Sequence, residues 1–315
     1  MPRQKKVITE YRHYSLPISF PVLVLDKENS FNISDKKADY LHFHNCLEIG
    51  ICHKGSGYLL VNGKTIEFNA GDITCIPRNF THTTYSKPGE ESQWSYIFLD
   101  TDELFKDLLP NSDFFDCCTT MTSSFKCIIY KEENPEIHHL IKSVFKEQRE
   151  QKTGYISNIR AHLLASCIEI IRLQEEVTAS ANVNDEVYQN DNLLVIAPAL
   201  NYIYRNYNQQ FHIEFLSEMC HLSSTHFRRV FNQIVGTNPL DFINSIRINK
   251  ACQFLRGTEF SIIAVSEQVG FHSVSSFNRY FTKVMGVSPR EWRHRVKIAD
   301  AKTEKQSILE LAGWK

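Results

Sequence analysis

The sequence lacks paired CxxC cysteines, and it lacks any apolar run near the roughly 20 residues needed to cross a bilayer. Its 9 cysteines are odd in number and scattered, which argues against a disulfide framework or a zinc ribbon. No apolar core follows the basic first residues, so we expect neither a signal peptide nor a membrane anchor. These absences predict a cytoplasmic protein with reduced thiols and no membrane partner.

The charge of the chain is unevenly divided along its 315 residues, a length that suggests about two domains. Residues 193–295 carry 11 Lys and Arg against 6 Asp and Glu, whereas residues 1–192 carry 20 against 27. A basic part attached to an acidic part is typical of a protein that binds nucleic acid at one end. A solvated basic face would give the same excess, so charge alone does not decide the function.

Residues 1–135 have the pattern of an antiparallel β-domain. Short β-rich runs recur about every ten residues, and Asn62-Gly63 between two of them is typical of a hairpin. We expect an antiparallel barrel or a sandwich.

The pattern becomes helical over residues 136–176, where two amphipathic stretches are expected to pack on the β-domain or on a second copy. We interpret this region as a dimerisation region that makes the protein a homodimer. Residues 177–192 are polar and predict a linker, and residues 296–315 form a tail to which we assign no function. The predicted fold class is therefore α+β with two domains, of which the C-terminal one is all-α.

Residues 193–295 contain an internal repeat with a period of 50 residues. The stretch HFRRVFNQIVGTNPLDFI from His226 aligns with SFNRYFTKVMGVSPREWR from Ser276. Each copy predicts a helix, a tight turn and a second helix, which is a helix-turn-helix. Gly236 and Gly286 suit the left-handed residue that ends a helix.

The second helix of each copy is amphipathic. We expect Ser223 and Ser273 to cap these helices, and Tyr280 and Val284 to face inward with the matched phenylalanines. An outer face that bears Arg suits the major groove, because the guanidinium fork can meet guanine O6 and N7 together. A helical bundle with exposed arginines is the alternative, and the repeat favours DNA binding. The outward positions are Ser224, Thr225, Arg228, Arg229 and Asn232 in the first copy, and Val274, Ser275, Asn278 and Arg279 in the second. We expect Arg247 and Lys250 to contact phosphates.

The stretch GFHSVSSFNRYFTKVMGVSPREWR resembles the signature of the AraC/XylS family of bacterial transcription regulators, and the resemblance covers essentially all of residues 193–295. It implies an activator more often than a repressor, with double-stranded promoter DNA and RNA polymerase as partners. His221 stands where the family commonly has Gly, and we expect it to adopt the left-handed conformation. The resemblance places these residues in the two recognition helices: Thr225, Arg228, Arg229, His272, Val274, Ser275, Asn278 and Arg279.

The stretch HFHNCLE from His42 resembles the first cupin motif, and Gly71, Pro77 and His82 match the second, with Asn79 in place of a Gly. His42 and His44 share one strand face because side chains alternate with period two, and Glu48 shares it if no bulge intervenes. His82 is expected from a neighbouring strand. Three histidines and a carboxylate suit a divalent transition metal such as Zn, Fe, Mn or Ni. The predicted ligand set is His42, His44, Glu48 and His82.

Three interpretations of this set remain open: a metal site, a metal-free pocket for a small-molecule effector, and a structural cluster. The regulator resemblance favours a sensor for a sugar or a related polar metabolite. Aromatic side chains that could line such a pocket are Tyr58, Trp94 and Tyr96. The rival function is a cupin metalloenzyme with an accessory helical domain. Because the chain carries a DNA-reading domain, we expect no catalysis.

Overall fold

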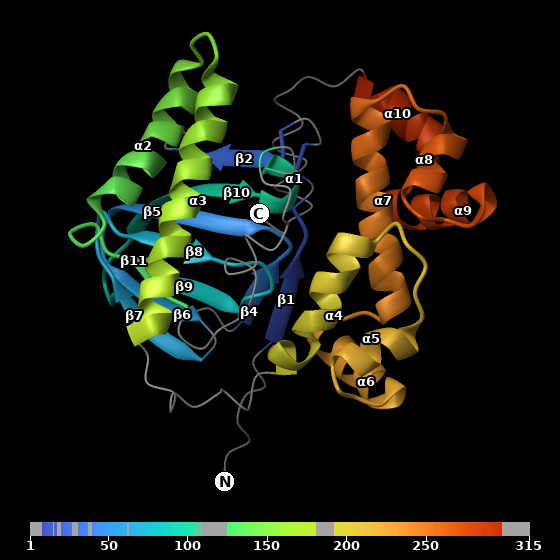
Figure 1. The fold of residues 1–315 in the computed structure, drawn as a ribbon, viewed down its shortest axis with the longest axis horizontal. Helices are drawn as coiled ribbons and strands as arrows, with labels where there is room; N and C mark the ends of the chain where they lie inside the picture. Colours follow the sequence, from blue (N-terminus) through green and yellow to red (C-terminus); the bar gives the residue numbers. More distant parts are fainter. Residues whose placement is uncertain are drawn as a thin grey trace. The chain divides into compact units, whose positions relative to one another are not determined.

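The structure is a computed structural model that describes residues 8–14, 16–17, 20–26, 31–36, 40–61, 63–105, 108, 125–180 and 192–297. Residue contacts divide the chain into two units, of which the first combines Met1–Thr9 with Pro21–Asn190 and the second combines Glu10–Phe20 with Asp191–Lys315. The first unit is rich in strands and the second is helical (Figure 1). The turn residue Asn62, Cys117 and Cys118, and the predicted tail beyond residue 297 lie outside the described residues.

Two antiparallel sheets build the first unit. One has the strand order β1-β4-β9-β6-β7, and the other has the order β11-β8-β5-β10-β2, with β3 also paired to β10. Among the described residues the sheets share no strand, so the predicted closed barrel is not observed. The strands are β1 (Ile8–Arg12), β2 (Val22–Leu25), β3 (Phe31–Ile33), β4 (Tyr40–His44), β5 (Leu47–Lys54), β6 (Gly57–Val61), β7 (Lys64–Phe68), β8 (Ile73–Ile76), β9 (His82–Ser86), β10 (Ser92–Leu99) and β11 (Ile128–Ile129).

Three helices accompany the sheets: α1 (Thr101–Phe105), α2 (Pro135–Glu150) and α3 (Tyr155–Ser180). Helices α2 and α3 lie side by side (Figure 1), and both bury apolar stripes at helical spacing. Helix α3 continues to Ser180, four residues into the range predicted as a linker, and residues 181–191 lie outside the description. Ile156, in the first turn of α3, is 43% exposed.

The second unit consists of α4 (Asn192–Asn206), α5 (Ile213–Met219), α6 (Ser224–Val235), α7 (Pro239–Gly257), α8 (Ile262–Gln268), α9 (Val274–Met285) and α10 (Pro289–Lys297). The predicted caps are confirmed, because Ser223 accepts from the His226 amide and Ser273 accepts from the Ser276 amide. Gly236 and Gly286 end α6 and α9 in the left-handed conformation, with φ of 78° and 74°. The α5–α6 and α8–α9 pairs are therefore two copies of one helix-turn-helix.

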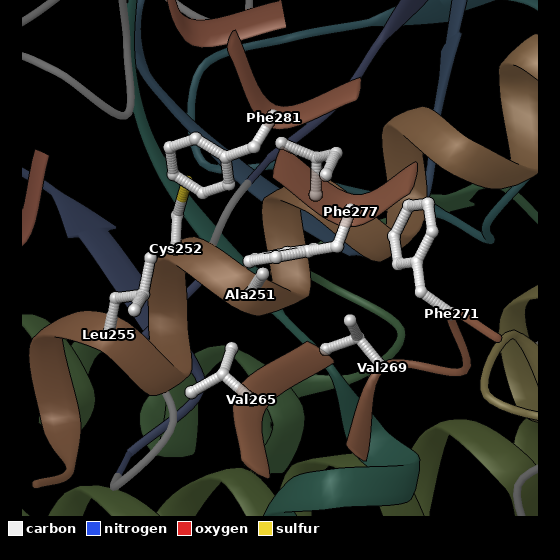
Figure 2. Packing of buried hydrophobic residues seen from close by; sticks show 9 residues of the cluster. Ala251, Cys252, Leu255, Val265, Val269, Phe271, Phe277 and Phe281 are labelled. Carbon is white, nitrogen blue, oxygen red and sulfur yellow. The ribbon is translucent and has the colours of Figure 1, made fainter. Parts of the chain in front are cut away.

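The matched phenylalanines lie in the cores of the two helix-turn-helix copies. Phe227, Phe231, Phe277 and Phe281 are all fully buried. Figure 2 shows Phe277 and Phe281 of α9 converging with side chains of α7 and α8. Each fully buried aromatic side chain stabilises the unit by a few kcal/mol. Because these side chains hold one face of α6 and α9 against the core, the opposite face of each helix points to solvent.

One residue predicted to face these cores points elsewhere, because Val284 is 44% exposed. Ile263, near the start of α8, is 57% exposed. Their neighbours Met285 and Ile262 pack against the core instead. One residue turns a helix by about 100°, so an error of one position moves a side chain from core to solvent.

His221 adopts the predicted left-handed conformation, with φ of 53°. The equivalent turn residue of the second copy is Gly270, which has φ of 84°. We therefore expect His221→Gly to raise the free energy of unfolding by about 0.5–1 kcal/mol in urea denaturation, because strain is removed at a smaller cost in chain entropy. The reverse control is Gly270→Ala, whose added Cβ would lie 2.5 Å from the Asn208 carbonyl oxygen. Gly270→Ala should therefore lower the free energy of unfolding. If His221→Gly also lowered it, the left-handed conformation of His221 would not be strained.

The described residues of the 10–20 segment belong to the second unit, and Tyr11 and Leu16 contact α4 and α7. The Tyr11 ring lies edge-on to Phe242 with centroids 5.2 Å apart, and its hydroxyl contacts that of Tyr204. Gln253 donates a hydrogen bond to the Leu16 carbonyl. Burial, with a smaller effect of Lys250, lowers the pKa of His13 to about 3.

His13 should make stability depend on pH. It is neutral when folded, but its unfolded pKa of 6.5 lets the unfolded chain bind a proton below that pH. The free energy of unfolding should therefore fall by about 1 kcal/mol from pH 7 to pH 5.5, and His13→Gln should remove that part. Urea unfolding at both pH values measures it, with the exposed His139→Gln as control. If the free energy of unfolding depended on pH equally in wild type and His13→Gln, a lowered pKa of His13 would be contradicted.

Candidate functional sites

The outer faces of α6 and α9 form the candidate DNA-binding surface. Most of the predicted residues are exposed there, whereas Ser224 and Val274 are half-buried at the first position of each helix. His226, which the sequence reasoning did not select, is also exposed in the first turn of α6. The exposed predicted residues are Thr225, Arg228, Arg229 and Asn232, and His272, Ser275, Asn278 and Arg279.

Neighbouring side chains position several cations on this surface. The Arg228 guanidinium lies 3.6 Å from Glu214 of α5, and the Arg279 guanidinium lies 5.6 Å from the Tyr280 ring centroid. Lys283 Nζ lies 3.4 Å from Asp241 Oδ1, which connects α9 to α7. Tyr280 is half-buried and supports the cations above it rather than joining the core fully.

Arg247 is a structural residue, which corrects the predicted phosphate contact. It is 7% exposed, and its Nε and Nη2 donate to the Tyr207 and Gln209 carbonyls at 2.7 and 2.9 Å. Its guanidinium also lies 5.7 Å from the Phe271 ring centroid. Burial lowers the pKa of Arg247. The side chain therefore holds the 207–210 loop and cannot reach DNA without breaking these bonds.

The four predicted ligands meet between the two sheets of the first unit. His42 on β4 is directly opposite His82 on β9, with ring centroids 4.1 Å apart. Glu48 comes from β5 in the other sheet, because the chain changes sheets between His44 and Leu47. Glu48 therefore lies beside the histidines as predicted, but it does so from a strand of the other sheet and not from a shared strand face.

Glu48 lies between two of the histidines. Its Oε2 is 3.3 Å from His44 Nε2, and its Oε1 is 3.8 Å from His82 Nε2. Burial by itself raises the pKa of Glu48, but the facing His44 and His82 outweigh it and hold that pKa well below the usual range. Burial lowers the pKa of His44. The site is therefore a buried carboxylate beside buried imidazoles, and burial favours the neutral form of His44.

The donor types and spacing fit a metal ion. Ligand atoms of His42, Glu48 and His82 all lie within 4.8 Å of one another. Imidazole nitrogen and carboxylate oxygen are the donors that divalent transition metals accept in proteins. His44 lies beside this trio with its ring centroid 5.0 Å from that of His82.

An aromatic stack adjoins the cluster. Trp94, Tyr96 and Phe98 alternate along β10, with neighbouring ring centroids 5.9 and 6.1 Å apart, and Phe98 lies edge-on to His44. Gly50 is required beneath this stack, because a Cβ there would lie 2.9 Å from the Tyr96 ring. Phe98, which the sequence reasoning missed, is the ring of this stack that contacts a histidine, and Tyr96 and Trp94 follow it along β10.

Tyr58 does not join this stack. It alternates with buried Gly57 and Leu59 on β6, and its ring lies 5.5 Å from that of Tyr85 on the opposite face. The register of β6 separates Tyr58 from Trp94 and Tyr96, and its role in lining an effector pocket stays a prediction.

None of the helices in the described parts of the chain combines the length and the apolar character needed to span a bilayer.

Comparisons with known proteins assign both regions. Residues 34–166 match the AraC-like ligand binding domain family, and residues 216–295 match a helix-turn-helix domain family. The lactose operon transcription activator of Staphylococcus xylosus is 24% identical over 79% of this chain and 84% of its own length. The melibiose operon regulatory protein of Escherichia coli K12 is 23% identical over 80% of this chain and 82% of its own.

A solved structure resembles the helical part. The DNA-binding domain of AdpA in complex with a target DNA is 24% identical, with a TM-score of 0.32 over 33% of this chain and 93% of that chain. The β-rich region and the helical region thus each match a family model. The two relatives, which align with this chain over most of their length, are transcription regulators. The chain therefore belongs to the AraC/XylS family of DNA-binding transcription regulators, with an N-terminal ligand-binding domain.

Proposed function

We propose that this regulator activates transcription in the cytoplasm when a small polar molecule, such as a sugar, binds its cupin-type β-domain. The observation that carries the proposal is the duplicated helix-turn-helix, in which buried phenylalanines orient two exposed, Arg-bearing helix faces. Recognition helices of this kind read base edges in the major groove. The relatives are regulators, which favours regulation over catalysis.

The spacing of the two reading helices supports one continuous binding site. Helix α7 joins the two copies and has 19 residues, which corresponds to a length of about 28 Å. That is close to the roughly 34 Å between successive major grooves on one side of the duplex. Thr225, Arg228, Arg229 and Asn232 then read one groove, and His272, Ser275, Asn278 and Arg279 read the next.

The sugar-like effector is supported by the relatives, which are named for lactose and melibiose operons. Trp94 and Tyr96 belong to the aromatic stack that reaches the polar cluster through Phe98, and aromatic faces are suited to packing against sugar rings. Effector binding would favour one arrangement of the ligand-binding domain and so change how DNA is bound.

Helices α2 and α3 are proposed to dimerise the protein. Leu164 and Ile168 of α3 stay half-buried in the single chain, beside exposed Ile156. A second copy would cover this apolar surface. Two copies bound to adjacent half-sites would then present the protein to RNA polymerase.

The test combines two measurements on the full chain. Fluorescence anisotropy with DNA from upstream of its own operon should show specific binding over scrambled DNA at the same salt concentration. A thermal-shift screen of sugars should find a compound that raises the unfolding temperature and changes DNA affinity. If the protein bound scrambled DNA as tightly as the upstream DNA, the proposed regulator function would be contradicted. If no stabilising sugar changed the affinity for DNA, the proposed sugar effector would be contradicted.

A further inference from the structure

A polar groove lies on the β-domain at the end of β5 that is farther from the histidine cluster. It opens beside Lys54, the last residue of β5, which is on the order of 20 Å along the strand from Glu48. The volume of the groove is about 530 Å³, within the roughly 300–1,000 Å³ that is usual for small-ligand sites. The residues that line it are Asn32, Lys54, Gly55, Glu90, Glu91 and Gln93.

Three of these side chains form a polar row across neighbouring strands. Gln93 of β10 is directly opposite Asn32 of β3 on one side and Lys54 of β5 on the other. Directly opposite residues of antiparallel strands point to the same face of the sheet. The pairing of β5 with β10 passes from Lys54 to Cys52 and skips His53, so a β-bulge brings Lys54 onto the face of Gln93. The polar row therefore joins two amides and an ammonium on one face.

The two turns beside the polar row are held together. The Ser56 amide and Ser56 Oγ both donate to Glu90 Oε2, at 3.1 and 2.9 Å. Gly55 has φ of 82°, and a Cβ there would lie 2.6 Å from the Glu91 carbonyl oxygen, so the turns approach too closely for any other residue. These contacts form the groove in the absence of a ligand, which lowers the entropy cost of binding.

The lining groups suit a ligand that is rich in hydroxyl groups. Within the described residues the side chains of Lys54 and Glu91 take part in no ion pair. An ammonium donates hydrogen bonds, a carboxylate accepts them, and the amides of Asn32 and Gln93 do both. A hydroxyl group also does both, so a neutral polyol can bond to every wall of the groove. Because charges of both signs line the groove, neither an anion nor a cation meets a uniform field.

We propose that this groove binds a neutral mono- or disaccharide, whose hydroxyl groups bond to the polar row and to Glu91. The inference rests on the proposed function for the class of effector and deepens it by giving the effector a site. Trp94 and Tyr96 are only 1% and 5% exposed, so a sugar stacks on their rings only if the β-domain opens. The groove needs no such opening, because Lys54 and Glu91 are already exposed to solvent.

The groove lies beside a series of contacts that reaches helix α2. Ser95 follows Gln93 by two residues and shares its strand face. Ser95 Oγ lies 2.7 Å from His53 Nε2 and donates to Asp26 Oδ1 at 3.2 Å. Asp26 also accepts a hydrogen bond from Arg149, in the last turn of α2. A sugar held by Gln93 thus binds next to the residues that fix one end of a helix proposed to dimerise the protein, which suits an effector site.

Isothermal titration of the full chain with four neutral sugars tests the proposal: glucose, galactose, lactose and melibiose. At least one of them should bind at one site per chain. The charged counterparts glucosamine and glucose 6-phosphate should bind more weakly than the best neutral sugar. With that sugar bound, hydrogen exchange should slow in residues 53–57 and 89–94 and stay unchanged in residues 42–48.

Asn32→Trp should weaken binding of that sugar by at least about tenfold, because an indole at this exposed position fills the groove. Glu91→Ala should weaken it about tenfold, because it removes a charged acceptor. The matched control is Glu132→Ala, which replaces an exposed glutamate that does not line the groove and should leave the affinity within about twofold of wild type. All three substitutions are at exposed positions, so the variants should melt close to wild type.

The groove would be contradicted by any of three results: no binding of the four sugars, tighter binding of the charged sugars, or unchanged affinity in both groove variants. Slowed exchange confined to residues 42–48 would place the sugar at the aromatic stack and also contradict it. DNA anisotropy on the same preparations separates the groove from the proposed function. Specific DNA binding with a sugar affinity that ignores both variants keeps the proposed function and rejects the groove. A sugar bound in the groove without specific DNA binding does the opposite.

Discussion

The double variant Arg229→Ala/Arg279→Ala should bind its specific DNA about 4 kcal/mol more weakly than wild type, roughly a thousandfold. Each guanidinium is exposed on a reading helix, and one good bidentate contact with guanine contributes about 1–3 kcal/mol. The residues lie in separate copies of the helix-turn-helix, so their effects should add. Fluorescence anisotropy at fixed salt concentration measures the loss.

The matched control for this variant is Arg172→Ala. Arg172 is an exposed arginine of α3 that pairs with Glu169, so it shares the charge of the reading arginines but not their place. Its DNA affinity should remain within about twofold of wild type, and the double variant should keep wild-type stability within about 0.5 kcal/mol. A double variant that binds specific DNA within threefold of wild type would falsify the assignment of α6 and α9 as reading helices.

Arg247→Ala should lower the free energy of unfolding by about 3 kcal/mol. The substitution leaves the Tyr207 and Gln209 carbonyls without the donors that hold them and opens space beside Phe271. Arg247→Lys should recover part of the loss, since an ammonium can reach one carbonyl but cannot reproduce the guanidinium fork. Urea unfolding gives the energies, and hydrogen exchange in the 207–210 loop assigns the change to this unit.

Arg229→Ala is the control that separates the two arginines. It should weaken DNA binding and leave stability unchanged, whereas Arg247→Ala should do the reverse at temperatures where the protein stays folded. If Arg247→Ala reduced the salt dependence of DNA binding without loss of stability, the result would support the phosphate contact expected for Arg247 from the sequence and contradict its structural role.

The helical repeat could be predicted because its information is local. Caps, helix ends and phenylalanines at spacings of three and four residues depend on positions within one or two turns, so the positions of Ser223, Ser273, Gly236 and Gly286 could be read directly. The error at Val284 is of one residue, because the neighbouring Met285 packs against the same core instead.

The β-domain could be predicted only in part, because strand pairing joins residues far apart in the chain. Alternation placed His42 and His44 together, but no local pattern shows that the chain leaves one sheet at His44 and enters the other at Leu47. The separation of Tyr58 from Trp94 and Tyr96 could not be read locally for the same reason, since a strand's register decides which face its side chains occupy.

The sequence by itself determined that this chain has a duplicated helix-turn-helix with Arg-bearing outer faces, because helix periodicity and capping are short-range properties. Tertiary structure alone decided which arginine is exposed on a helix face and which holds a loop, since Arg229 and Arg247 differ only in what surrounds them. It also decided that Glu48 meets the histidines from the opposite sheet and that the Nδ1 atoms of His44 and His82 lie beside the Cys46 and Phe80 carbonyls. Burial, register and hydrogen-bond partners are set by the packing of distant segments, and no stretch of the sequence contains them.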